Sequence, residues 1–283
     1  MSQLNIIDYR SIDETAYKAR PTVEVPLSIY KDELYKRRYY DNLIFKMDYS
    51  TNNNVGLFSE NNEPIKLYDV YSSIDNWKNE MIEELSYRAT PRLRANKTIP
   101  IRFIKELECA LYKYGQIQII YEIANDEELT NQFYNRQLKY RISPSLYEVF
   151  PRKPTEPPRV PDWDLFKERE FSDTIRISIS DKIVMNGLSV SLDRLTDELK
   201  PYINSSSIFE YIYSDNVTYQ DYINVLSAHK MGILELKMSN SKFDYEGMIL
   251  EIYRNPFSRN DEHSEELTRL DKEFPLQITE RFE

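Results

Sequence analysis

The chain has 283 residues, which is long enough for two domains that each bury a hydrophobic core. Its apolar fraction of 41% and charged fraction of 30% are those of a globular protein, so a wholly disordered chain is excluded. A net charge of −10 argues against a general nucleic-acid binder, because duplex binding relies on Lys and Arg. The densest basic cluster, Lys36–Arg38, is short and is predicted to be a solvated face.

The sequence contains no predicted export signal or membrane span. No apolar run approaches the roughly 18 residues that a span needs. The N-terminus lacks a basic and then apolar signal region, so the compartment stays unknown, with a cytoplasmic protein or one within a particle as the default expectation. The only cysteine, Cys109, falls in an apolar helical stretch, where it is expected to act as a small hydrophobe without nucleophilic reactivity.

Residues 1–42 are predicted to form an N-terminal arm. Polar and aromatic residues mix there without a lasting period, and Pro21 and Pro26 interrupt any long helix. An arm of this kind, rich in tyrosine and charge, either wraps a neighbouring molecule or forms a loosely packed terminus, and both alternatives stay open.

Residues 43–125 are predicted to form the first domain, a mixed sheet packed on two helices. Alternating apolar residues predict strands, and apolar spacings of three and four predict helices. The expected elements are strands at 43–47 and 55–59, a helix over 68–85, a strand near Leu93, a helix over 101–114 and a strand over 116–123. Gly115 is expected to end the second helix, because glycine adopts left-handed backbone angles without penalty.

Residues 126–172 are predicted to hold a polar helix, over 126–142, and then the linker between the domains. Six of the chain's 14 prolines lie between residues 144 and 161. Such a run favours an extended, semi-rigid spacer and is incompatible with a regular helix or a central strand.

Residues 173–240 are predicted to form a second, similar domain, and the acidic tail 241–283 an appendage that packs on a domain or a partner. The second domain is expected to contain strands at 175–179, 183–185 and 188–190, a helix after Ser191, a strand over 208–213, a helix ending near Gly232 and a closing strand over 233–238. Asn186-Gly187 predicts a tight turn. In the tail, alternation at 248–252 predicts a strand, and 261–274 a charged helix.

The two domains are predicted to be copies of one pattern. Residues 93–123 and 212–238 share the order strand, polar turn, helix, glycine, strand, with Ile99 aligned with Val217 and Gly115 with Gly232. The chain holds only five glycines, so two at matching points support a duplication. The predicted class is therefore α+β, with two similar small domains joined by a proline-rich linker.

This repeat resembles the extramembrane domain of the ExbD/TolR family. In the second copy the resemblance is carried by Met185-Asn186-Gly187, Val190-Ser191-Leu192 with Leu195 and Leu199, Ser214-Asp215-Asn216-Val217-Thr218-Tyr219, and Met231-Gly232-Ile233. In the first copy it is carried by Glu63-Pro64-Ile65, Ala95-Asn96-Lys97-Thr98-Ile99-Pro100, and Tyr114-Gly115. The resemblance implies domains that pair and bind envelope components beside a proton-driven motor. The family's proton-carrying acid lies in an N-terminal membrane helix, for which this sequence shows no counterpart.

No catalytic, cofactor-binding or metal-binding residue is predicted. The scattered glycines make no phosphate loop, and no Ser-centred elbow occurs. His229 lies on a predicted helix, and His263 follows Asp261-Glu262, a setting typical of the surface rather than of a metal site. Carboxylates are abundant, so a paired-acid site of the glycosidase kind stays open, although the sequence selects no pair.

The sequence favours a non-catalytic assembly protein that acts through protein–protein contacts, by self-association or within a larger complex. Duplication and 23 tyrosines motivate this prediction, because tyrosine suits interfaces with its apolar ring and polar tip. Its setting is expected to be an ExbB/ExbD-type envelope complex. The alternative is a structural subunit of a phage or virus particle, such as a tail or connector ring.

Overall fold

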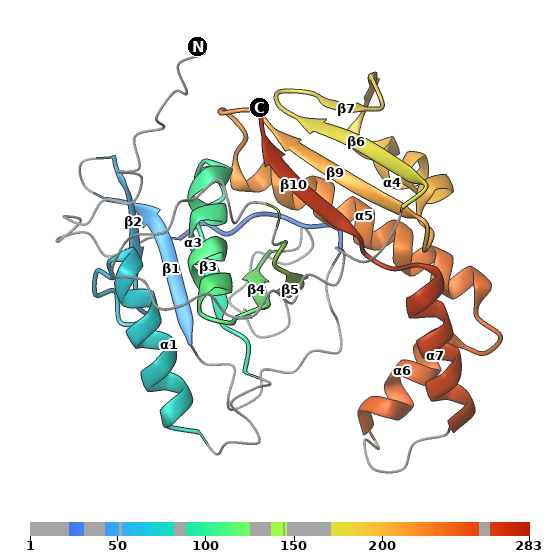
Figure 1. The fold of residues 1–283 in the computed structure, drawn as a ribbon, viewed down its shortest axis with the longest axis horizontal. Coiled ribbons are helices and arrows are strands. Elements are labelled where there is room, and N and C mark those ends of the chain that lie inside the picture. Colours follow the sequence, from blue (N-terminus) through green and yellow to red (C-terminus); the bar gives the residue numbers. More distant parts are fainter. Residues whose placement is uncertain are drawn as a thin grey trace.

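Two similar sheet-and-helix units make up the part of the chain that the computed structural model describes (Figure 1). These residues are 23–30, 43–50, 53–81, 89–124, 137–143, 145, 171–254 and 261–283. Within them the strands form two five-stranded mixed sheets, each packed against helices, which confirms the predicted α+β class and the two similar units. Apart from Ser145, the proline-rich stretch 144–161 lies outside the described residues.

The first unit, within residues 43–143, has the strand order β2-β1-β3-β4-β5. Strands β1, β3 and β4 run parallel, and β2 and β5 flank them in the antiparallel direction. Its elements are β1 (Ile44–Tyr49), β2 (Val55–Phe58), η1 (Leu67–Asp69), α1 (Val70–Asn79), β3 (Arg92–Ala95), α3 (Ile101–Lys113), β4 (Gln118–Glu122) and β5 (Gln137–Arg141). The strands and helices predicted for this domain are present, but α1 is preceded by a short 3-10 turn and ends at Asn79, before the predicted end at residue 85.

Helix α3 ends at the predicted glycine. Gly115 has a φ of 80°, in the left-handed region that glycine enters without a steric penalty. Its N–H donates to the Tyr112 carbonyl at 3.0 Å, and the Gln116 N–H donates to the Leu111 carbonyl at 3.0 Å. This pair of bonds is the Schellman arrangement, which satisfies carbonyls at the end of α3 and turns the chain directly into β4.

Strand β5 replaces part of the polar helix that the sequence predicted over 126–142. Residues 137–141 pair antiparallel with β4, so the helix prediction is wrong there. Leu138 and Tyr140 alternate with more polar neighbours and are buried in the core, because period-two alternation places both side chains on one face of a strand. Residues 126–136 lie outside the described part.

The second unit, within residues 171–283, has the strand order β10-β9-β6-β7-β8. Its elements are β6 (Asp173–Ile179), β7 (Ile183–Met185), β8 (Leu188–Val190), α4 (Leu192–Leu199), η4 (Lys200–Tyr202), β9 (Ser207–Tyr213), α5 (Tyr219–Asn240), α6 (Tyr245–Arg254), α7 (Asp261–Glu273) and β10 (Ile278–Phe282). Asn186 and Gly187, with φ of 49° and 85°, form the predicted tight turn between β7 and β8. The parallel set β6-β9-β10 corresponds to β1-β3-β4.

The prediction that a helix ends near Gly232 and that residues 233–238 form the closing strand is wrong. Helix α5 continues through this region to Asn240. At Gly232 it passes close to the end of α4. A Cβ built there would lie 3.1 Å from the Ile203 Cδ1 atom and 3.5 Å from the Thr196 carbonyl oxygen. This glycine therefore permits close helix packing, which a sequence pattern does not distinguish from a helix end. The predicted match of Gly115 with Gly232 is accordingly wrong, because Gly115 ends α3 whereas Gly232 lies inside α5.

The closing position of the second sheet belongs to β10, which comes from the tail that the sequence predicted as an appendage. Strand β10 pairs parallel with β9, as β4 pairs with β3. Helices α6 and α7 are inserted between α5 and β10 and project together from the unit (Figure 1). The charged helix predicted over 261–274 is confirmed as α7. The strand predicted at 248–252 is wrong, because that segment lies in α6.

The described part of the N-terminal arm, residues 23–30, packs on its own chain and contacts both units. Leu27 bridges Ala124 at the end of β4. The Gln220 side chain, on α5, accepts from the Leu27 N–H and donates to the Leu27 carbonyl, both at 2.8 Å. The Lys97 N–H donates to the Glu24 carbonyl at 2.7 Å. This segment therefore fastens the two units to each other.

Gly232→Leu is expected to lower the free energy of unfolding by about 1 to 3 kcal/mol, because the added side chain overfills the contact with Ile203. Urea denaturation measures this change. Ser239→Leu, at an exposed position of the same helix, is the control and is expected to stay within about 0.5 kcal/mol of the parent chain. An unchanged midpoint for Gly232→Leu would show that α4 and α5 do not need this close approach.

Candidate functional site

The two units meet where the turn before α3 faces the turn before α5. The Ile101 N–H donates to the Val217 carbonyl at 2.8 Å, and the Tyr219 N–H donates to the Ile99 carbonyl at 2.7 Å. Pro100 and Thr218 form an antiparallel bridge between these two bonds. Ile99 and Val217 are the residues at which the sequence repeat aligns, so each copy donates and accepts at the same two positions.

Any antiparallel bridge has such a reciprocal pair of bonds, but here the paired positions are also equivalent in the two units, which is the pattern of a twofold interface. In an isologous contact, residue i of one subunit meets residue j of the other, and j meets i. Here both partners belong to one chain. The turn before α3 and the turn before α5 therefore make a pseudo-twofold contact between the units.

The turn before α5 is held in place by a capping box. The Asp221 N–H donates to the Thr218 hydroxyl at 3.3 Å, and the Thr218 N–H donates to the Asp221 carboxylate at 2.9 Å. Together these bonds satisfy two backbone donors at the helix start and fix the direction in which the chain enters α5. Local sequence thus orients the backbone that pairs with the first unit.

A cross-strand ion pair also recurs in both units. Arg92 on β3 pairs with Glu122 on β4 at 3.1 Å, and Glu210 on β9 pairs with Arg281 on β10 at 3.0 Å. In both cases the partner lies two residues beyond the register position, with the charges exchanged. The first pair is buried, whereas in the second Arg281 is 50% exposed and Glu210 is 20% exposed. The recurrence supports the equivalence of β4 and β10.

Behind the backbone contact lies a buried ion cluster. The Lys105 Nζ lies 2.7 Å from Glu280 Oε1 and 3.1 Å from Glu108 Oε2, and all three side chains are at most 2% exposed. Lys105 and Glu108 come from α3 of the first unit, whereas Glu280 comes from β10 of the second. The ion pair between Lys105 and Glu280 therefore joins the units inside the protein.

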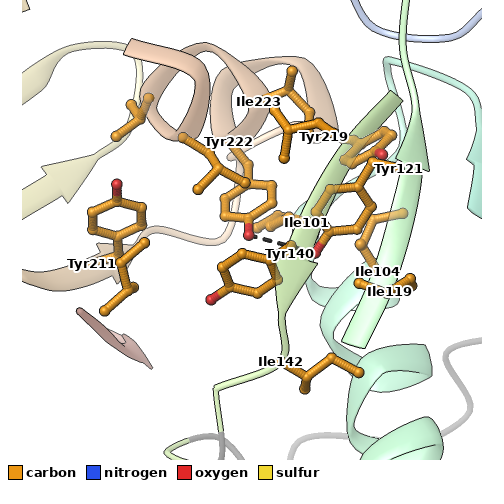
Figure 2. Packing of buried hydrophobic residues seen from close by; sticks show 14 of the residues in the cluster. Ile101, Ile104, Ile119, Tyr121, Tyr140, Ile142, Tyr211, Tyr219, Tyr222 and Ile223 are labelled. Atoms are coloured by element: carbon orange, nitrogen blue, oxygen red, sulfur yellow. Dashed lines mark hydrogen bonds between the residues drawn. The ribbon is translucent and has the colours of Figure 1, made fainter. Parts of the chain in front are cut away.

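Tyrosines surround these charges. The Tyr121 hydroxyl donates to Glu108 Oε1 at 2.5 Å, and the Tyr213 hydroxyl donates to Glu280 Oε1 at 2.6 Å. The Lys105 Nζ lies 3.9 Å from the centroid of the Tyr222 ring, a cation–π contact. Figure 2 shows the rings of Tyr121 and Tyr222 together. Their hydroxyl oxygens are hydrogen-bonded at 3.5 Å. Lys105, Glu108, Glu280, Tyr121, Tyr213 and Tyr222 are called the lysine–tyrosine cluster below.

The cluster holds two carboxylates against one ammonium group. Burial raises the pKa of Glu108 to about 7, and the charge of Glu280 adds to the rise, although Lys105 opposes it. Desolvation also raises the pKa of Tyr121 and of Tyr213 well above the ordinary value, so both phenols stay protonated and donate. The cluster therefore takes up a proton near neutral pH.

Glu108 is expected to make stability fall as the pH rises. The native state binds more protons than the unfolded state between the ordinary pKa of 4.5 and the native pKa of about 7. Between about pH 4.5 and 7 the parent chain should lose about 2.5 kcal/mol through this group, and Glu108→Gln should remove that loss. Urea denaturation across this range measures it, with the exposed Glu265→Gln as control. Parallel pH profiles for the parent and Glu108→Gln would contradict the assignment.

Two other residues singled out in the sequence are also buried. Cys109, beside Glu108 on α3, is 3% exposed, and burial raises the pKa of its thiol well above the usual value, which confirms the small-hydrophobe prediction. His229 on α5 is fully buried rather than on the surface. Its Nδ1 lies 2.9 Å from the Tyr211 hydroxyl, and burial lowers the pKa of the imidazole to about 3. His263 pairs with Glu251 at 2.6 Å, between α7 and α6.

Sequence reasoning missed Lys105, Glu108 and Glu280. A Lys and a Glu at i and i+3 are typical of a solvated helix face. Helix α3, however, is buried on all sides from Ile101 to Leu111, apart from Arg102. The available signal was the unusual tyrosine content, because buried charges need polar partners that also fill space.

No family model, curated protein or solved structure matches the chain. Any function must therefore be argued from the geometry. In the part of the chain that the structure describes, no helix is long and apolar enough to span a bilayer. The same residues contain no group of three or more His, Cys, Asp or Glu side chains placed to hold a metal ion.

Proposed function

We propose that the protein is a non-catalytic assembly protein, a covalently linked pair of similar units that acts through protein–protein contacts. The observation that carries this proposal is the reciprocal backbone pairing between Ile101 and Val217 and between Tyr219 and Ile99. Pairing of this kind is typical of the subunits of a symmetric dimer. Because one chain contains both units, the pair forms without a second chain. The surfaces of the units that face away from their mutual contact are then available to protein partners.

The lysine–tyrosine cluster supports a structural role for the charged residues. Lys105, Glu108 and Glu280 are at most 2% exposed, and their bonds connect one unit to the other. A substrate needs access to the groups that act on it, whereas an ion pair that fixes two bodies needs exclusion of water. The position of the cluster favours the second use.

The setting that we propose is an envelope complex of the ExbB/ExbD type, and the resemblance of the repeat to that family supports it. A structural subunit of a phage or virus particle is the alternative setting. Both require the same behaviour of the chain, namely stable association with copies of itself or with other proteins.

Native mass spectrometry of the assembly purified from its natural source tests the proposal. We expect a mass well above the 33.9 kDa of one chain. Fractionation with envelope membranes supports the first setting, and recovery in a purified particle supports the second. A monomer that persists at about 10 μM, a concentration at which specific complexes form, with no partner recovered from the source, would contradict an assembly role.

A further inference from the structure

The second unit contains a segment that the duplicated fold does not need. In the first unit, α3 turns at Gly115 directly into β4. In the second, the C-terminal part of α5, helices α6 and α7 and their connections, residues 233–277, intervene before β10. Sites of function are commonly grafted onto a fold by such additions.

This segment builds a pocket of about 370 Å³ against α5. Ile233, Phe274 and Leu276 supply apolar lining, and Tyr245 from α6 adds an aromatic wall. Apart from Tyr30 and Lys230, all lining residues lie between residues 233 and 276. The volume lies in the range of small-molecule sites, about 300 to 1,000 Å³.

Two ammonium groups line the same pocket. Lys230 and Lys237 lie two turns apart on one face of α5. The Lys237 Nζ pairs with the Asp271 carboxylate at 2.5 Å, and the Lys237 side chain is only 14% exposed, whereas that of Asp271 is 70% exposed. Lys230 lies 4.9 Å from the centroid of the Tyr30 ring. The lining of the pocket thus combines apolar side chains with two cations, in a chain whose net charge is −10.

Tyr245 adds a hydrogen-bond donor. Burial, with the charge of Asp271, raises the pKa of its phenol to about 12, so the proton stays in place at neutral pH. A carboxylate that reached Lys237 would replace Asp271 as the partner of an ammonium group whose side chain is only 14% exposed. Because Asp271 is mostly in water, the exchange leaves no buried charge unpaired.

We propose that this pocket binds small amphipathic carboxylates, with the apolar body against Ile233 and Phe274 and the carboxylate on Lys237. The aromatic and aliphatic lining accepts an aryl or alkyl group. The Lys237 ammonium group selects the anion over the corresponding alcohol, since charge-assisted hydrogen bonds are about twice as strong as neutral ones.

Isothermal titration of the full chain with three probes tests the proposal. They are 3-phenylpropionate, 3-phenylpropan-1-ol, which keeps the body but lacks the charge, and acetate, which keeps the charge but lacks the body. We expect saturable binding of 3-phenylpropionate with a dissociation constant below about 1 mM, and at least tenfold weaker binding of the other two probes. Equal binding of the alcohol, or no saturation by 3-phenylpropionate up to about 10 mM, overturns the proposal.

Two variants that are expected to change the affinity for 3-phenylpropionate in opposite directions test whether binding occurs in this pocket. Lys237→Met keeps the side-chain stem and is expected to weaken 3-phenylpropionate binding about tenfold, whereas Asp271→Asn removes the competing carboxylate and is expected to tighten it about threefold. Lys272→Met, beside Asp271 in sequence but outside the pocket, is the control and should leave the affinity unchanged. All three positions lie outside the hydrophobic core, and circular dichroism verifies folding. Equal effects of Lys237→Met and Lys272→Met would show that only overall charge matters.

Discussion

Lys105→Met is expected to lower the free energy of unfolding by about 3 to 5 kcal/mol, the largest effect of any single substitution considered for this protein. The replacement removes the only ammonium group of the lysine–tyrosine cluster and leaves the carboxylates of Glu108 and Glu280 buried without their counter-charge. The Tyr121 and Tyr213 hydroxyls still donate to them, but neutral donors do not balance two charges. Urea denaturation followed by far-UV circular dichroism measures the change.

Two further variants separate the loss of charge balance from the loss of packing. Lys105→Met combined with Glu108→Gln and Glu280→Gln removes all three charges and is expected to recover most of the lost stability, because the penalty comes from the unpaired acids. Lys97→Met breaks an exposed ion pair with Glu24 and is expected to cost at most about 1 kcal/mol. If the triple variant were no more stable than Lys105→Met, the packing of the lysine stem would be the main contribution.

Acid is expected to destabilise the protein through His229. Burial lowers the pKa of this imidazole from 6.5 to about 3. Between these two pH values the imidazole is protonated in the unfolded state but neutral in the native state. Stability contributed by this group is therefore present above about pH 6.5 and declines as the pH falls toward 3. Relative to a variant that does not titrate, His229→Gln, the parent chain should lose about 3 kcal/mol between about pH 7 and pH 4.5.

Tyr211→Phe is the matched control for this experiment. It removes the hydroxyl that lies 2.9 Å from His229 Nδ1 and leaves the imidazole in place. Its stability should differ from that of the parent by an amount that does not change between about pH 7 and pH 4.5, since in both chains His229 stays neutral in the native state and is protonated in the unfolded state. A difference between His229→Gln and the parent that is constant with pH would contradict the assignment of the acid effect to His229.

Much of the local structure was predictable because its signals are short-range. Alternation identified most of the strands, Asn186-Gly187 identified a turn and Gly115 identified a helix end. Each depends on the backbone preferences of a few neighbouring residues. The alignment placed Ile99 and Val217 at equivalent positions of the two units. The structure also brings these two residues into one reciprocal backbone contact, which the alignment did not predict.

The failures arose where tertiary context decides between local alternatives. The apolar residues among 233–238 are compatible with either a strand or a helix. The helical alternative is the one in which α5 packs closely against Ile203 at Gly232. Because that segment is helical, another strand must pair with the free edge of β9. Strand β10 does so, from about 40 residues further along the chain. No pattern within a short window contains that information.

By itself the sequence determined the class of the fold, the presence of two similar units, the two turns that begin α3 and α5, and the acidic, cysteine-poor character of the chain. Only the tertiary structure decided that those turns pair, that Lys105 and Glu280 meet between the units, and that residues of α5, α6 and α7 line an open pocket that includes Lys237. The physical reason is range. Backbone preferences act over a few residues, whereas the burial of a charge or the lining of a cavity depends on segments that folding brings together from distant parts of the chain.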